Sequence, residues 1–133
     1  MAGFTHTLGV TYKTDAGTIT STTDTYIGDA ENDLDLGGAT ALAAGAVNSE
    51  YDLQITVAKI QSMVLYSDQN IVVKTNSTGS PGNTVNLTAK KQVVWNTDSP
   101  MAKPFTADVT KLFLSNSNTI TAAAVRIRVL ENI

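Results

Sequence analysis

The feature that most constrains this chain is the alternation of apolar and polar residues in short segments. In Tyr51–Val57 the odd-numbered side chains are apolar and the even-numbered ones polar, and Val125–Val129 repeats the pattern. Gly, Asn, Asp or Ser interrupts such segments about every ten residues, and no segment carries the apolar stripe of a helix. A period of two residues turns one face of a strand toward a core and the other toward water, so the sequence predicts an all-β fold.

The predicted strands are Phe4–Tyr12, Thr18–Ile27, Tyr51–Val57, Met63–Tyr66, Ile71–Thr75, Thr84–Leu87, Gln92–Trp95, Val109–Leu114 and Val125–Val129. About eight to ten strands in one domain, residues 1–133, favour a two-sheet β-sandwich, jelly-roll-like in form, over a closed barrel. Residues 1–5 are expected to form a flexible N-terminal arm. Residues 39–47 are expected to form a helical turn or an extended segment. The proline-containing stretch 98–106 is expected to be a loop that crosses between sheets.

Charge and composition exclude several classes of function. The net charge is -3 and the pI is about 4.9, so the chain offers no basic surface for phosphate, and we expect no nucleic-acid partner. No stretch of 18 apolar residues is present, so we expect no membrane partner. The chain has no cysteine and a single histidine, His6, so it has no thiol nucleophile and only one imidazole that could act as a base in nucleophilic catalysis. We therefore predict that the protein is not an enzyme.

The sequence offers one weak candidate for a metal site, an acidic segment in which carboxylates occupy alternate positions: Asp29, Glu31, Asp33 and Asp35. In an extended chain these side chains project to one side about 7 Å apart, and such a row needs solvent or a cation. The calcium-loop template, however, requires Gly where Leu34 stands and Glu where Thr40 stands. We therefore favour a solvated acidic loop and expect neither a metal nor another cofactor.

Two further features permit more than one interpretation. Trp95, the only tryptophan, shares a strand face with Val93 and is interpreted as a core residue. The alternatives for this side chain are a stacking platform for a sugar ring and an anchor in a subunit interface. Arg126 and Arg128 share the polar face of their strand. They are expected to face water, or to pair with acidic groups across a subunit boundary.

The segments between Val57 and Trp95, reading VAKIQSMVLYSD, IVVKTNS, PGNTVNL and VVW, resemble small virion-associated β proteins of tailed phages. The likeness continues more weakly through Phe105–Asn116, FTADVTKLFLSN, and contains no catalytic motif. The resemblance implies a capsid decoration or cement protein, or another small head or tail component. Such proteins are often jelly-roll or related β-sandwiches that assemble as trimers or other small oligomers.

The function predicted from these observations is structural. We expect a capsid decoration or cement protein that forms a homo-oligomer, with a trimer favoured, and that binds the major capsid protein or another virion protein. Its expected location is the virion, after assembly in the host cytoplasm. The alternative is a carbohydrate- or receptor-binding β-sandwich module of a fibre or a secreted protein.

Overall fold

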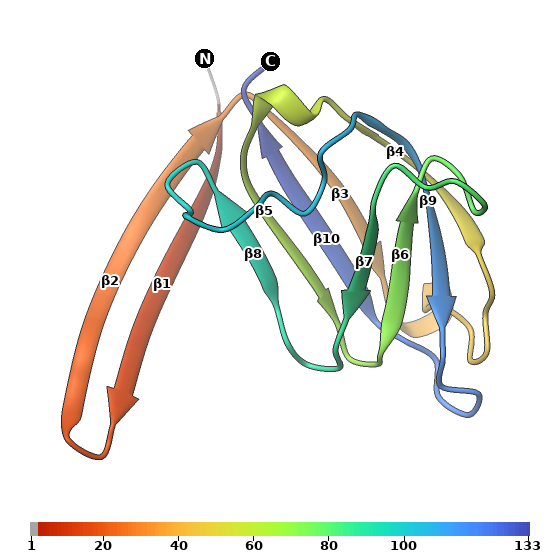
Figure 1. Ribbon diagram of the computed structural model, residues 1–133, viewed down its shortest axis with the longest axis horizontal. Helices are drawn as coiled ribbons and strands as arrows, with labels where there is room; N and C mark the ends of the chain where they lie inside the picture. The colour runs from red at the N-terminus through yellow and green to blue at the C-terminus, as the bar shows by residue number, and fades with distance from the viewer. Residues whose placement is uncertain (1–2) are drawn as a thin grey trace.

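The computed structural model describes residues 3–133, and in this range the fold is built almost entirely from β-strands (Figure 1). The strands are β1 (Phe4–Thr14), β2 (Gly17–Gly28), β3 (Ala30–Leu36), β4 (Ser49–Ile55), β5 (Ile60–Ser67), β6 (Ile71–Thr75), β7 (Thr84–Leu87), β8 (Val93–Asn96), β9 (Val109–Asn116) and β10 (Val125–Glu131). Two four-stranded antiparallel sheets pack face to face, and β1 and β2 form a separate two-stranded sheet. The predicted all-β sandwich is confirmed.

The two packed sheets have the strand orders β3-β10-β5-β8 and β4-β9-β6-β7, and their inner faces form one core. The alternation seen in the sequence explains this core, because one side chain in two points inward along most strands. In β10, for example, Val125, Ile127 and Val129 are fully buried whereas Arg126 is exposed. The predicted inward-facing residues are thus confirmed on both sheets.

Several predicted connections also agree with the structure. β6 and β7 pair as an antiparallel hairpin whose connection includes Gly79–Asn83. The chain between β8 and β9, residues 97–108, passes from one sheet to the other, as expected for the stretch 98–106. Phe105 lies in this loop and is completely buried, so the crossing segment also helps to close the core.

Residues 39–47 combine features of both expected conformations. A short 3-10 helix covers Gly38–Thr40, and Leu42 then forms an isolated antiparallel bridge with Ala123. Leu42 is buried in the core, so this small-residue stretch closes one end of the sandwich.

A second 3-10 turn, Val57–Lys59, leads directly into β5. None of the described helices is long and apolar enough to cross a bilayer.

The β1–β2 hairpin projects from the sandwich (Figure 1). Its strands have 11 and 12 residues, and Gly17, with φ at +126°, occupies the tight turn at its tip, a conformation that favours glycine. Residues 1–5 were expected to form a flexible arm. Residues 1 and 2 lie outside the described range, whereas Phe4 and Thr5 are paired with β2. The projecting element is therefore the whole hairpin rather than its first residues.

Candidate functional site

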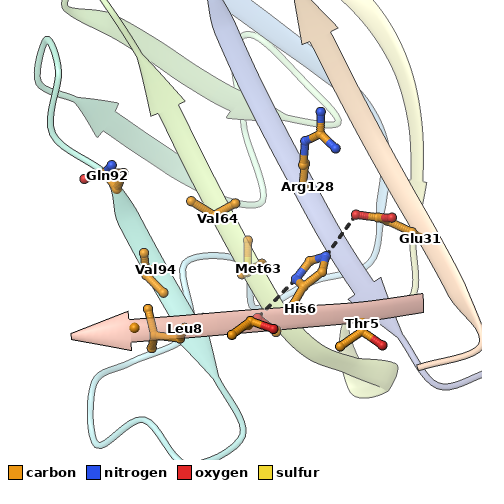
Figure 2. Close-up of a pocket in the computed structure, with 12 residues that line it drawn as sticks. Thr5, His6, Leu8, Glu31, Met63, Val64, Gln92, Val94 and Arg128 are labelled. Carbon is orange, nitrogen blue, oxygen red and sulfur yellow. Dashed lines mark hydrogen bonds and ion pairs between the residues drawn. The ribbon is translucent and has the colours of Figure 1, made fainter. Parts of the chain in front are cut away.

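A groove in the described part of the chain lies between the base of the hairpin and the outer face of the β3-β10-β5-β8 sheet. It has a volume of about 620 Å³. Figure 2 shows β1 crossing this face, with Glu31 of β3 near one side and Val94 of β8 near the other. The lining residues are Thr5, His6, Thr7, Leu8, Gly9, Glu31, Ser62, Met63, Val64, Gln92, Val94 and Arg128. The lining is therefore mixed, with aliphatic side chains such as Val64 and Val94 beside polar ones such as His6 and Arg128.

Three of the four acidic residues singled out in the sequence line up on the outer face of β3, as the alternation predicted. Opposite them on β10, Arg126 pairs in register with Asp35 and Arg128 with Asp33. The Nε atom of Arg126 lies 3.6 Å from an oxygen of Asp35, and a guanidinium nitrogen of Arg128 lies 3.5 Å from the other. These side chains are about half exposed, so each pair contributes little stability. The arginines nevertheless balance the charge of the row within a single chain.

Asp29, the fourth acidic residue, has a different role at the turn between β2 and β3. Its carboxylate accepts a hydrogen bond of 2.7 Å from the backbone N–H of Ile133, and its own N–H donates to the carbonyl of Glu131. Asp29 therefore holds the C-terminal residues Glu131 and Ile133 beside the turn between β2 and β3 by hydrogen bonds. Among residues 3–133 no three His, Asp or Glu side chains are placed to hold a metal ion.

His6 connects the hairpin to the sheet. Its Nε2 lies 2.9 Å from Oε1 of Glu31, and its Nδ1 lies 3.2 Å from Oγ of Ser62 (Figure 2). A neutral ring satisfies both contacts when Nε2–H donates to the carboxylate and Nδ1 accepts from the serine hydroxyl. The three residues come from β1, β3 and β5, so this junction ties three strands of two different sheets together.

The junction has the composition of a Ser-His-acid triad, and only one of its three members, His6, was weighed as catalytic from the sequence. Ser62 lies within β5, where it is in register with Leu130 on one side and Asn96 on the other, and only 6% of it is exposed. Backbone N–H groups inside a strand paired on both sides are used in the ladder. They are therefore not free to stabilise an oxyanion. We call His6, Glu31 and Ser62 the clasp, because their contacts join the hairpin to the sheet.

Two further contacts fix the base of the hairpin. The hydroxyl of Tyr26 donates a 3.2 Å hydrogen bond to Asp98 in the loop after β8. Burial first, and then the Asp98 carboxylate, raise the pKa of Tyr26 above its usual value. At Gly28 the chain passes so close to β10 that an added Cβ would lie 2.4 Å from the carbonyl oxygen of Glu131. Only glycine permits this approach.

Trp95 is partly buried and packs against the core without belonging to its buried cluster. Its ring nitrogen donates to the carbonyl of Met101 at 3.1 Å, and the ammonium of Lys103 lies 4.7 Å from the ring centre. This cation–π contact occupies a face that a sugar ring would need. The observation gives no support to the use of Trp95 as a stacking platform.

Beyond its base the hairpin carries exposed apolar side chains, of which Val10 also lines a groove with Val94 and Pro100 of the same chain. Val10 is 41% exposed, Tyr12 59% and Ile19 68%. The side-chain hydrogen bonds of this half, such as Thr11 to Ser21 and Thr14 to Gly17, remain within the hairpin. The sequence predicted two strands here, Phe4–Tyr12 and Thr18–Ile27. The length of the hairpin and its exposed apolar residues became evident only from the structure.

Comparison of the chain with protein-family models, with curated proteins and with solved structures gives no significant match.

Proposed function

We propose that this chain is a non-enzymatic structural component of a phage virion, a decoration or cement protein that binds the head surface as a homo-oligomer, with a trimer favoured. Its partner on the head would be the major capsid protein or another virion protein. The observation that carries this proposal is the projecting hairpin. A sandwich with a complete core of its own has no need of a long two-stranded arm, whereas a subunit that must reach its neighbours does.

The order of the strands supports the same proposal. Numbered from β3, the eight strands of the sandwich fall into the orders 1-8-3-6 and 2-7-4-5. Eight strands in two packed sheets support an assignment to the jelly rolls. This architecture occurs widely in viral capsid subunits. The resemblance of Val57–Trp95 to small virion proteins of tailed phages points the same way. We therefore assign the fold to the jelly rolls as part of the proposal.

The alternative, a carbohydrate-binding module, receives no comparable support. The only tryptophan ring is packed against the core and faced by Lys103. The groove beneath the hairpin has aliphatic side chains but no aromatic ring among its lining residues. Recognition of sugars commonly relies on a stacked aromatic ring.

The proposal is tested by binding to heads assembled from the major capsid protein without this chain. We expect the wild-type protein to co-sediment with such heads to a saturating ratio and to raise the temperature at which they rupture. The matched variants are a shortened hairpin, in which Val10–Thr22 is replaced by Asn-Gly so that Gly9 and Thr23 still pair, and Ile120→Ser on a loop, at a residue that is 90% exposed. Only the shortened variant should bind poorly. Failure of the folded wild-type protein to bind heads at any concentration would contradict the proposal.

A further inference from the structure

We propose that the distal half of the β1–β2 hairpin, residues 10–22, binds the outer face of the β3-β10-β5-β8 sheet of a second copy of this chain, and that successive contacts of this kind close a ring. The inference rests on the proposed function, since it identifies the partner of the projecting arm. It can fail separately, because oligomerisation and head binding are measured independently.

The first argument is one of length. β1 has 11 residues and spans about 37 Å at about 3.4 Å per residue. The outermost strands of a four-stranded sheet lie only about 14 Å apart at about 4.8 Å per strand. A hairpin that crosses this face therefore extends beyond it, and about half of β1 cannot be covered by its own sheet.

The second argument is the chemistry of the uncovered half. On β1 the side chains of His6 and Leu8 face the sheet, and the two-residue period places Val10 and Tyr12 on the same face. Their partners on β2 are Thr22 and Thr20, so no charged side chain lies between them. An isolated two-stranded hairpin is marginally stable at best in water. An uncharged face of valine, tyrosine and threonine gains stability if another sheet covers it.

The third argument concerns the receiving surface. Beside the groove under the hairpin lies a second groove of about 460 Å³ on the same face, and the two share lining residues, so they are continuous. The second groove is lined by Val64, Tyr66, Lys90, Gln92, Arg126 and Arg128. Its lining combines the side chains of Val64 and Tyr66 with one amide and three cationic groups. No residue of the chain's own hairpin is among these lining residues.

One chain already provides an example of the proposed contact. Leu8 of β1 lines the first groove together with Val64 and Val94, which shows that this strand fits the sheet in a crosswise orientation. The distal half repeats the same alternation with larger side chains. A second copy would present the same sheet face to the distal half of the strand.

The fourth argument is stoichiometry. Each copy exposes one distal hairpin and one open sheet face. Because these are two different surfaces, the contact between copies is head-to-tail, and both surfaces are covered on every copy only when the ring closes. One face of a short hairpin buries on the order of 400 Å² per partner, about half of the roughly 800 Å² that a stable interface needs on each side. In a ring each copy makes this contact twice. A closed ring is therefore stable where an open dimer is not.

The first experiment measures solution mass by light scattering after size-exclusion chromatography of the full chain. We expect a closed oligomer, with about 42 kDa for a trimer of the 14.0 kDa chain. The double variant Val10→Ser, Tyr12→Ser should run as a monomer of about 14 kDa, since both side chains lie on the exposed part of the hairpin. The matched control is Ile27→Ser, which removes a 68% exposed apolar side chain from the opposite face of the hairpin. This control should remain oligomeric.

The second experiment identifies the receiving face and uses the absence of native cysteine. Chains carrying only Tyr12→Cys are mixed with chains carrying only Tyr66→Cys and oxidised, so that a disulfide between the two variants must join different molecules. We expect this mixed dimer to form, and not the corresponding dimer of Tyr12→Cys with Ile120→Cys. A wild-type protein that is monomeric at all concentrations would overturn the inference. So would an oligomer that survives the double Ser substitution or that joins Tyr12→Cys to Ile120→Cys equally well.

The two proposals fail in different ways. If the ring forms but does not bind heads, the contact between copies stands and the virion function falls. If a monomer binds heads through its hairpin, the virion function stands, and the hairpin binds the capsid protein instead of a second copy.

Discussion

The sandwich and the β1–β2 hairpin are both antiparallel β-structure, yet they gain their stability in opposite ways. In the sandwich, every second side chain enters a shared core that includes fully buried residues such as Leu65, Leu112 and Ile127. In the hairpin, the contacts run mainly between its own two strands, and the apolar side chains Val10 and Tyr12 remain exposed. The difference shows that hydrogen bonding between two strands is not enough to make a β-hairpin stable by itself. A second layer is needed to cover one face.

The junction between the two regions is correspondingly narrow. It consists of the His6 clasp, the hydrogen bond from Tyr26 to Asp98 and the close passage of Gly28 past Glu131. Changes in the core should therefore unfold the sandwich, changes at the junction should release the hairpin, and changes in the distal hairpin should leave the single chain stable. The predictions below test this division.

The largest effect is expected in the core. Phe105→Ala removes a completely buried ring from the loop between β8 and β9, and we expect the free energy of unfolding to fall by about 3–5 kcal/mol because a cavity remains. Tyr12→Ser in the distal hairpin should change it by no more than about 0.5 kcal/mol when both proteins are compared as monomers. Urea unfolding followed by circular dichroism measures both values. Equal losses for the two variants would refute the division into two regions.

A smaller but more localised effect is expected at Gly28. Its substitution by alanine places a Cβ 2.4 Å from a backbone oxygen of β10, and backbone cannot move aside as a flexible side chain can. We expect Gly28→Ala to cost about 1–3 kcal/mol and to accelerate amide hydrogen exchange in β1 and β2 more than in β5. Gly9→Ala is the matched control, because an added Cβ at Gly9 meets no atom within 4 Å. Faster exchange throughout the sandwich would contradict a local role.

The clasp is expected to contribute less than the close passage at Gly28. His6→Ala removes two partly buried hydrogen bonds, and we expect a loss of about 1 kcal/mol together with faster exchange at the base of the hairpin. Ser62→Ala removes only one of these contacts and should have a smaller effect. The same variants test whether the clasp of His6, Glu31 and Ser62 has only a structural role. Ester hydrolysis by the wild-type protein that both substitutions abolish would show that the site is catalytic.

Most of the sandwich could be predicted from the sequence because its signal is local. A period of two residues identifies a strand and its inner face without knowledge of its neighbours, and β4 and residues 125–129 of β10 follow this rule. The hairpin turn at Gly17 is similarly local. The strand order required contacts between residues far apart in the chain, such as β3 with β10, and no short-range pattern carries that information.

The site could be predicted only in part, for the same reason. The alternation of Glu31, Asp33 and Asp35 correctly placed them on one face, but the arginine partners of Asp33 and Asp35 lie more than 90 residues away, and Glu31 pairs with His6. Ser62 gave no signal in the sequence, because a serine inside an apolar strand becomes meaningful only once His6 lies across it.

The smallest effect should come from Tyr26 and should depend on pH. Its pKa is raised in the folded protein, chiefly by burial and then by Asp98, so the folded state holds the phenolic proton more tightly than the unfolded chain does. The resulting stabilisation is complete below the unfolded value of about 10 and disappears as the pH rises through the higher folded value. We expect the midpoint of thermal unfolding to decrease more steeply above pH about 10 in the wild-type protein than in Tyr26→Phe. Tyr12→Phe, at an exposed position, should retain the wild-type dependence. If Tyr26→Phe retained it as well, another group would be responsible, and the hydrogen bond to Asp98 would not hold the hairpin against the sandwich.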